Sequence, residues 1–200
     1  MRLLPYGRDA VLVEVSDANA VVAVREAALA LPGVVEAVAG AQSVLVEFDL
    51  GLTGLAAVRA GLQSMPLAPV DPREAGHVDV PVTYDGADLT EVASMIGISE
   101  ADLISLHTAP LYRVRFCGFA PGFAYLDGLD PRLHVARRGS PRTSVPAGAV
   151  AIAGEFAAVY PRRSPGGWQL LGHTTTELWN VNASPPALLR PGTTVRFVPS

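Results

Sequence analysis

Three segments decide the fold of the C-terminal half: FCGFAPGFAYLDGL (residues 116–129), PRTSVPAGAVAIAG (141–154) and YPRRSPGGWQLLG (160–172). In and around them, short apolar runs alternate with turns rich in Gly and Pro. These runs predict strands over Leu111–Cys117, Ala149–Ala153, Ala157–Tyr160, Gln169–Leu171, Glu177–Val181 and Thr194–Val198. Several short strands joined by such turns are typical of a closed or partly closed antiparallel β-barrel.

The N-terminal half has a different pattern, in which strands alternate with helices. Strands are expected over Ala10–Val15, Val34–Ala39, Ser43–Phe48 and His77–Val82, and helices over Ala18–Leu31, capped by Asp17, and Gly54–Ser64, capped by Thr53. The order β-α-β-β-α-β is that of the split βαβ, ferredoxin-like motif. The last strand fits equally well as part of the next domain, because the Pro-rich linker Met65–Gly76 precedes it.

Between the two patterns, residues 88–107 predict two short helices. Asp88 begins the first and Gly97 ends it, and Ser99 with Asp102 caps the second. We therefore predict an α+β chain with a ferredoxin-like domain over residues 1–76 and a β-barrel domain over residues 77–200.

Composition excludes several classes of function. No apolar run reaches the length of a membrane span, and Arg8 and Asp9 interrupt the N-terminal run that a signal peptide would need, so we expect a soluble cytoplasmic protein. The chain has no lysine, which excludes a Schiff base and a lysine-containing P-loop. The single Cys117 excludes an internal disulfide and a cysteine-based zinc site, and is expected to be a small buried residue.

Charge is unevenly distributed along the chain, whose net charge is −4. Residues 113–163 hold eight Arg against three acidic residues. A short basic segment in an acidic chain does not suit a nucleic-acid-binding protein. It fits a local site for a small carboxylate or phosphate, or a set of solvated surface arginines, and charge alone leaves both open.

The first turn-rich motif covers residues 118–125. Gly118 and Gly122 permit close approach of a ligand to the backbone, Pro121 fixes the turn, and the aromatic side chains provide a wall. These aromatic side chains are Phe119, Phe123 and Tyr125. The other interpretation is a strand-to-loop corner with core aromatics, which the residues by themselves favour.

Two further motifs offer groups that bind anions. Arg142 lies between Pro141 and Pro146, and a rigid loop suits bidentate recognition of a carboxylate or phosphate. Arg137 and Arg138 lack such flanking prolines and are predicted to be surface charges. The run Ser164–Trp168 contains Gly166 and Gly167, which form either an anion-binding nest of N–H groups or a tight hairpin whose Trp covers a barrel end.

The four histidines have no metal-ligand spacing, so no metal site is predicted. His173, in the Gly-rich half, is best placed for proton chemistry. His107 ends a helix, where it favours the terminal carbonyls. Ser164 is not a triad nucleophile, because no Gly-x-Ser-x-Gly elbow surrounds it.

In this order, the motifs resemble the B-type component of bacterial 5-oxoprolinase, a family also described as allophanate hydrolase subunit 1 or KipI-like and related to a carboxyltransferase domain of urea carboxylase. The matching positions are His107, Gly118–Leu129, Pro141–Gly148, Ala151–Gly154, Tyr160–Pro161, Ser164–Trp168 and Pro185–Gly192. The resemblance implies a ferredoxin-like domain followed by a cyclophilin-like barrel. The N-terminal half matches by pattern more than by residues.

The resemblance also implies a function. The expected enzyme opens 5-oxoproline to glutamate with ATP and Mg²⁺, by phosphorylation of the lactam oxygen and attack of water, together with a cyclophilin-like C-type subunit and a lactam-utilisation-type subunit. The implied catalytic residues are His173 and Arg142; the implied substrate- or nucleotide-binding residues are His107, Gly118, Phe119, Pro121, Gly122, Phe123, Tyr125, Pro146, Gly148, Ser164, Gly166, Gly167 and Trp168. Two alternatives remain: a KipI-like inhibitor of a sensor histidine kinase, and a subunit for urea or allophanate metabolism.

This chain departs from the family pattern at several positions near the implied site. These are Ala149, Phe156, Ala157, Ala158 and His173, where the family has mostly small polar or charged groups. Substrate choice resides in such polar contacts, so the departures bear on the substrate more than on the fold.

Overall fold

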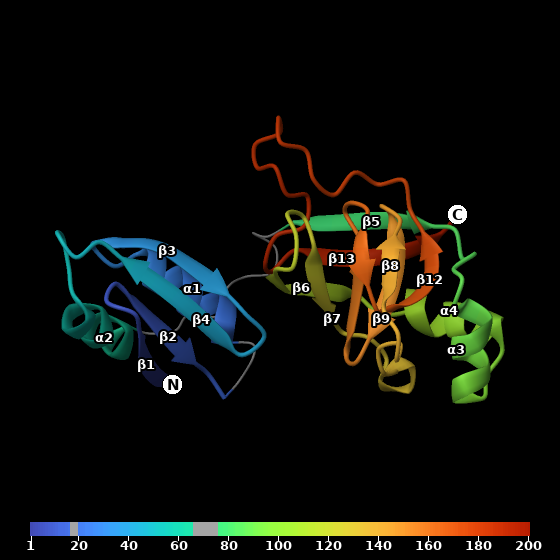
Figure 1. The fold of residues 1–200 in the computed structure, drawn as a ribbon, viewed down its shortest axis with the longest axis horizontal. Helices are drawn as coiled ribbons and strands as arrows, with labels where there is room; N and C mark the ends of the chain where they lie inside the picture. The colour runs from blue at the N-terminus through green and yellow to red at the C-terminus, as the bar shows by residue number, and fades with distance from the viewer. Residues whose placement is uncertain (17–19, 66–75) are drawn as a thin grey trace. The chain divides into compact units, whose positions relative to one another are not determined.

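The computed structural model describes residues 1–16, 20–65 and 76–200, which divide into two compact units, Met1–Glu74 and Ala75–Ser200 (Figure 1). The predicted linker over 65–76 falls almost entirely outside the described residues, and so does the predicted Asp17 cap. None of the helices in the described ranges is long and apolar enough to cross a bilayer.

The first unit is a four-stranded antiparallel sheet in the order β1-β2-β4-β3 with two helices. Its elements are β1 (Arg2–Tyr6), β2 (Ala10–Glu14), α1 (Ala20–Leu29), β3 (Val34–Ala39), β4 (Ser43–Phe48) and α2 (Leu55–Ser64). The predicted hairpin of β3 and β4 is confirmed, and alternate residues such as Val44 and Val46 are buried. The predicted Thr53 cap is wrong: Gly54 holds the N-cap position of α2 and makes no side-chain bond.

Two strands differ from the order expected for this unit. The edge strand β1, which pairs with β2, was not predicted, because most of its side chains are exposed and it lacks a clear apolar alternation. The strand predicted at the end of the first domain, β5 (His77–Val82), instead pairs in parallel with β13 (Thr194–Pro199) in the second unit. The alternative assignment of this strand is therefore correct, and the ferredoxin-like description of the first unit remains a prediction.

The second unit contains a nearly closed seven-stranded sheet in the order β12-β9-β10-β7-β6-β13-β5. Its remaining strands are β6 (Tyr112–Cys117), β7 (Ala124–Asp127), β9 (Ala149–Ala153), β10 (Phe156–Val159) and β12 (Gln169–His173). A single bridge between Thr83 and His173 joins the two edges. This agrees with the predicted barrel, except that β5 and β13 are parallel.

The predicted strand over residues 177–181 is wrong. Trp179 makes only an isolated bridge with Ala187. The side chain of Asn180 accepts a hydrogen bond from the backbone of Asn182, which turns the chain, and Pro185 and Pro186 have no N–H for a ladder.

The barrel sheet buries apolar side chains on both faces. Along β9, Val150 and Ile152 belong to the interior cluster, whereas the alternating Ala149, Ala151 and Ala153 belong to a second cluster on the other face. A two-stranded ribbon of β8 (Arg142–Val145) and β11 (Ser164–Gly166) contributes Val145 to this second cluster, and Trp168 follows the ribbon. The small alanines leave room for that ribbon to lie close to the sheet.

Helices α3 (Leu89–Ile96) and α4 (Glu100–Thr108) lie together at one end of the unit (Figure 1). Their predicted ends are confirmed: Gly97 ends α3 in the left-handed conformation, and the Ser99 hydroxyl accepts from the Asp102 N–H. Asp88 lies at the N-cap of α3 but makes no capping bond, so its carboxylate has another role. The short 3-10 helix η1 (Pro131–Leu133) precedes the segment that leads to the candidate site.

Candidate functional site

A cavity of about 80 Å³ lies where the β8–β11 ribbon meets the loop between β6 and β7. It is lined by Phe119, Phe123, Tyr125, Arg137, Tyr160, Gly166, Gly167 and Trp168. Six of these eight residues were predicted from the sequence, and they come from two motifs about 40 residues apart. The two that were missed are Arg137, which was predicted to be a surface charge, and Tyr160. We call this space the aromatic cavity.

The walls of the aromatic cavity are buried rings in edge-to-face contact. Phe123 packs edge-on against Tyr160 and Trp168, with ring centroids 5.3 and 5.7 Å apart. Such pairs hold their rings in fixed relative orientations. Gly166 is required beside them, because a Cβ atom there would lie 2.3 Å from the hydroxyl oxygen of Tyr160. The loop and ribbon therefore position one rigid wall.

The rim of the cavity carries a backbone strain. Phe119 has φ of +69°, the one positive φ found at a described residue other than Gly, and its side chain is 59% exposed. The left-handed conformation costs a non-glycine residue roughly 1–2 kcal/mol, and little burial compensates for it here. Hydrogen bonds hold the loop around Phe119: Gly118 N–H donates to the Phe123 carbonyl and Phe123 N–H to that of Ala120. Strain of this kind clusters at sites of function.

The opposite rim carries a free cation. Arg137 is exposed and makes no ion pair with a described residue; its guanidinium carbon lies 5.9 Å from the ring centroid of Trp168. Its neighbour is fastened to the ribbon, because the Arg138 N–H donates to the Gly167 carbonyl at 2.8 Å. Proline spacing could not reveal Arg137, since its position depends on this backbone contact between distant segments.

The aromatic cavity also contains a hydroxyl that stays protonated. Burial raises the pKa of the Tyr160 phenol above its ordinary value, and a hydrogen bond with the backbone of Trp168 acts in the opposite direction. A protonated phenol can donate a hydrogen bond to a ligand oxygen. Ring faces, one donor and one unpaired guanidinium suit a small flat molecule with an anionic group.

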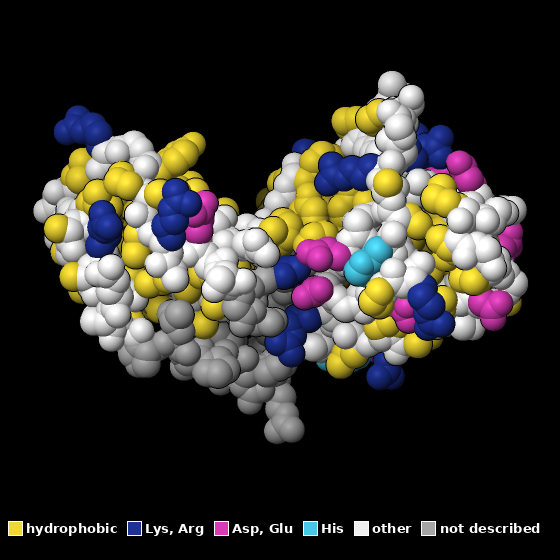
Figure 2. Space-filling model, turned by 90° about the horizontal axis from the view of Figure 1, so that it is seen from below, with side chains coloured by type: hydrophobic (Ala, Val, Ile, Leu, Met, Phe, Trp, Pro, Cys, Tyr) yellow, Lys and Arg dark blue, Asp and Glu magenta, His cyan; other side chains and the backbone are white. Residues whose placement is uncertain are grey.

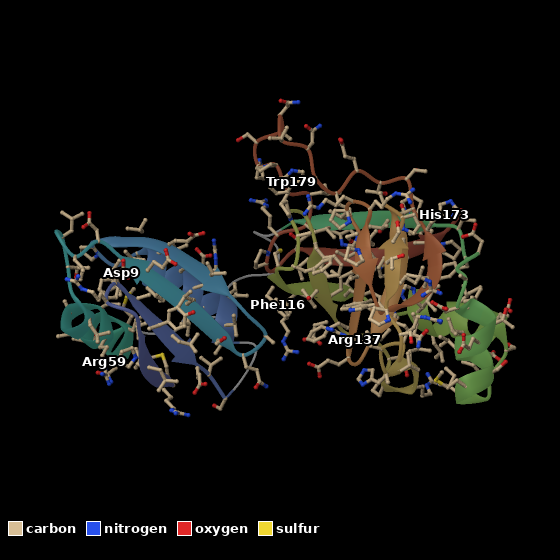
Figure 3. All side chains as sticks on the ribbon, viewed as in Figure 1. Asp9, Arg59, Phe116, Arg137, His173 and Trp179 are labelled. Carbon is tan, nitrogen blue, oxygen red and sulfur yellow. The ribbon has the colours of Figure 1, made fainter. Side chains whose placement is uncertain are left out.

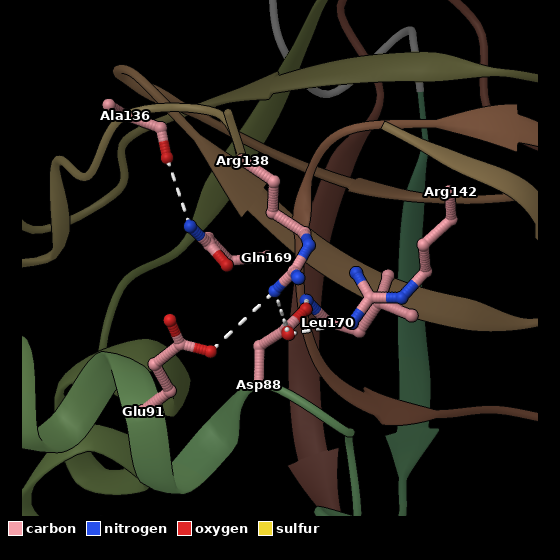
Figure 4. Close-up of polar contacts among 7 residues, drawn as sticks. All are labelled: Asp88, Glu91, Ala136, Arg138, Arg142, Gln169 and Leu170. Atoms are coloured by element: carbon pink, nitrogen blue, oxygen red, sulfur yellow. Dashed lines mark hydrogen bonds and ion pairs between the residues drawn. The ribbon is translucent and has the colours of Figure 1, made fainter. Parts of the chain in front are cut away.

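Arg142, predicted to be catalytic, lies in a buried ion-pair network and not in this cavity (Figure 4). Asp88, whose side chain is 1% exposed, accepts hydrogen bonds from Arg138 and Arg142 through one carboxylate oxygen and from the Leu170 N–H through the other, each at 2.7 Å. Glu91 lies 3.6 Å from Arg138. We call these residues the Asp88 network; it joins α3, the 138–142 segment and β12.

His107 lies in the core of the second unit. It is fully buried, stacks on Phe197 with ring centroids 4.5 Å apart, and its Nδ1 atom lies 2.7 Å from the Tyr84 hydroxyl. Burial lowers the pKa of its imidazole to about 3, so the ring is neutral. Since the ring is closed to solvent on all sides, His107 serves the core in this structure.

His173, the other predicted catalytic residue, lies away from the aromatic cavity. Figure 3 shows it on a different part of the second unit from Arg137. Its Nδ1 atom lies 2.8 Å from the carboxylate of Asp85, and its backbone pairs with Thr83. It therefore does not meet Arg142 or the aromatic rings.

The remaining predicted residues are placed around the cavity or beyond it. Gly122 and Pro121 belong to the same loop as Phe119, and a Cβ atom on Gly122 would lie 2.8 Å from the Cβ of Trp179. Ser164 pairs with Val145 inside the ribbon. Pro146 and Gly148 form the turn before β9, where the Gly148 N–H donates to the Tyr160 carbonyl.

The basic segment does not form one continuous patch. On the face of the second unit in Figure 2, arginine side chains are interspersed with acidic and apolar ones. Within the described ranges, no group of three or more His, Cys, Asp or Glu side chains could hold a metal ion. The expected nucleotide also finds no fitting site at the glycine turns: the Gly118 N–H already has a partner, and about 80 Å³ is below the roughly 300 Å³ of typical ligand pockets.

Comparison with known proteins settles the family. A family model described as "Carboxyltransferase domain, subdomain C and D" matches residues 1–189. The chain belongs to this family. Two curated members are both named as the B-type component of 5-oxoprolinase. The Escherichia coli O157:H7 protein is 43% identical over 177 residues, which are 84% of this chain and 79% of that protein.

The second named member of the carboxyltransferase C and D family is from Bacillus subtilis; it is 47% identical over 124 residues, 60% of this chain and 52% of that protein. A solved structure, that of TTHA0988, superposes with a TM-score of 0.86 at 37% identity over 96% of this chain. The match covers 40% of the TTHA0988 chain. This chain therefore spans only part of several of its relatives.

Proposed function

We propose that this chain is the B-type component of an ATP-dependent 5-oxoprolinase, which opens 5-oxoproline to glutamate. The observation that carries the proposal is the aromatic cavity with the unpaired Arg137 at its rim, in a family whose curated members are named as this component of 5-oxoprolinase. 5-Oxoproline is a small ring that carries one carboxylate and one amide carbonyl. Its ring suits the aromatic wall, its carboxylate suits Arg137, and its carbonyl suits the phenol of Tyr160.

In this proposal, the chain binds and orients the substrate and does not complete the reaction by itself. Among the residues that line the aromatic cavity there is no carboxylate, imidazole or thiol that would act as a base or nucleophile. Arg137 would hold the carboxylate, while Phe119 and Trp168 would exclude water from one face of the ring. The nucleotide would bind to another component of the enzyme, because the described residues offer no cavity at the glycine turns that fits it.

Exposed apolar side chains support a partner-dependent site. Phe119 at the rim is 59% exposed, and Trp179, whose Cβ lies near Gly122 of the same loop, is 37% exposed (Figure 3). Val181 farther along is 75% exposed. Exposed apolar side chains gathered at a rim mark interaction sites. We propose that a C-type subunit covers this rim and that a lactam-utilisation-type subunit completes the enzyme.

Reconstitution tests this function. The chain is mixed with the C-type and lactam-utilisation-type subunits from the same source, ATP and 5-oxoproline, and glutamate is measured. We expect glutamate to form only when all subunits are present. The absence of glutamate with every subunit present would overturn the proposal.

A further inference from the structure

A second cavity, of about 200 Å³, lies between α3 and the segment that precedes the ribbon. It is lined by Glu91, Met95, Ala136, Arg137, Arg138, Gly139 and Gln169. Only Arg137 is shared with the aromatic cavity. We call this space the polar cavity; it is smaller than the roughly 300–1,000 Å³ of drug-sized sites and therefore suits a small ligand.

Gln169 presents an unused hydrogen-bond acceptor at the polar cavity. Its side-chain nitrogen donates to the Ala136 carbonyl at 3.2 Å, which fixes the orientation of the amide. The opposite atom, Oε1, is buried and has no hydrogen-bond partner, although the residue is only 4% exposed (Figure 4). A buried acceptor without a donor is unfavourable, so a ligand that donates to it would gain this energy back.

The charged groups around the polar cavity divide into two kinds. Arg137 has no anionic partner among the described residues, and the Nε atom of Arg138 is buried without an acceptor. Glu91, with a side chain that is 62% exposed, provides a carboxylate on the side of α3. The cavity therefore offers donors from the 137–138 segment and acceptors from Glu91 and Gln169.

We propose that the polar cavity binds a small α-amino acid. The ligand's carboxylate would pair with Arg137, and its ammonium group would donate to Gln169 Oε1 and Glu91. Its side chain would run along Met95. A simple anion would face Gln169 Oε1 and Glu91, and a simple cation would face two guanidinium groups; a zwitterion satisfies both sides. Because Oε1 is closed to solvent, binding requires a small rotation of the Gln169 side chain.

This inference goes beyond the proposed function, because it rests on the donors and acceptors of a separate cavity. The two meet at one point: the proposed reaction releases glutamate, which is an α-amino acid. L-Glutamate is for that reason the first probe. The binding test uses this chain alone, without ATP or partner subunits, so its result is independent of turnover.

Isothermal titration compares L-glutamate and L-alanine with glutarate, which is glutamate without its ammonium group. We expect saturable binding of both amino acids at millimolar concentrations and at least roughly tenfold weaker binding of glutarate, because a hydrogen bond to a charged group is worth one such step or more. Absence of binding by L-glutamate and L-alanine would overturn the proposal. Equal binding of glutarate would also overturn it, by showing recognition of the carboxylate alone.

Variants locate the site. Gln169→Leu removes the acceptor, and Met95→Trp, at an exposed position on α3, fills the cavity from its other side. Each is expected to weaken L-glutamate binding at least roughly tenfold. Arg59→Gln, in the first unit, is the control and should leave binding unchanged. Thermal unfolding checks that each variant is folded; if Met95→Trp is folded and binds L-glutamate normally, the polar cavity is not the site.

Discussion

The Asp88 network and the aromatic cavity use neighbouring residues of one segment for opposite purposes. In the network, Arg138 and Arg142 share a buried carboxylate, so their charges are occupied. At the cavity, Arg137 has no anionic partner among the described residues, and Phe119 keeps a strained backbone with an exposed ring. The difference teaches that a cation is available to a ligand only where the fold does not already neutralise it.

The largest effect is expected from Asp88→Ala. This change leaves two guanidinium groups and the Leu170 N–H without their acceptor, so the free energy of unfolding should fall by about 3 kcal/mol. Urea denaturation measures it. The control is Asp85→Ala, which removes an exposed carboxylate beside His173 and should cost less than about 1 kcal/mol. Equal losses would mean that the Asp88 network does not stabilise the fold.

His107 sharpens the comparison because it was predicted to bind a ligand and lies in the core. Burial lowers the pKa of its imidazole from 6.5 to about 3, so the unfolded chain binds a proton that the folded chain does not. Stability is therefore full above pH 6.5 and falls below it, by up to about 1.4 kcal/mol per pH unit. Tyr84, whose hydroxyl contacts His107, and Tyr112, whose hydroxyl donates to its backbone carbonyl, stay protonated throughout.

The measurement is the free energy of unfolding of wild type and His107→Gln between pH 7 and pH 5. The variant should lose the steeper decline of the wild type, whatever its absolute stability. His134→Gln, at an exposed position, should keep it. Identical slopes for wild type and His107→Gln would show that the imidazole is not held neutral in the core.

Phe119 tests the strain at the aromatic cavity. Phe119→Ala and Phe119→Gly both remove the ring, but only Gly accepts φ of +69° without strain. The Gly variant should therefore be about 1 kcal/mol more stable than the Ala variant. Both should lose 5-oxoproline turnover in the reconstituted assembly to a similar degree. Equal stability of the two variants would mean that the strain is absent, and full turnover of either would mean that the ring is not part of the site.

Much of the second unit is predictable from its sequence, because β6, β9, β10, β12 and β13 are apolar runs between Gly and Pro turns. The strands β1, β8 and β11 are not, since exposed or Gly- and Pro-containing strands lack periodicity. For the candidate site, the aromatic residues of two motifs are found correctly. The distinction between Arg137 and Arg142 is not, because it depends on Asp88, which lies 54 residues from Arg142 in the chain.

The central claim is that Arg142 stabilises the fold and Arg137 serves the ligand. Its most direct test is to measure urea denaturation and reconstituted 5-oxoproline turnover for Arg142→Gln and Arg137→Gln side by side. We predict that Arg142→Gln lowers the free energy of unfolding by about 1–2 kcal/mol. Arg137→Gln should change it by less than about 0.5 kcal/mol and reduce kcat/KM at least roughly tenfold. Normal turnover in a folded Arg137→Gln assembly would contradict the account.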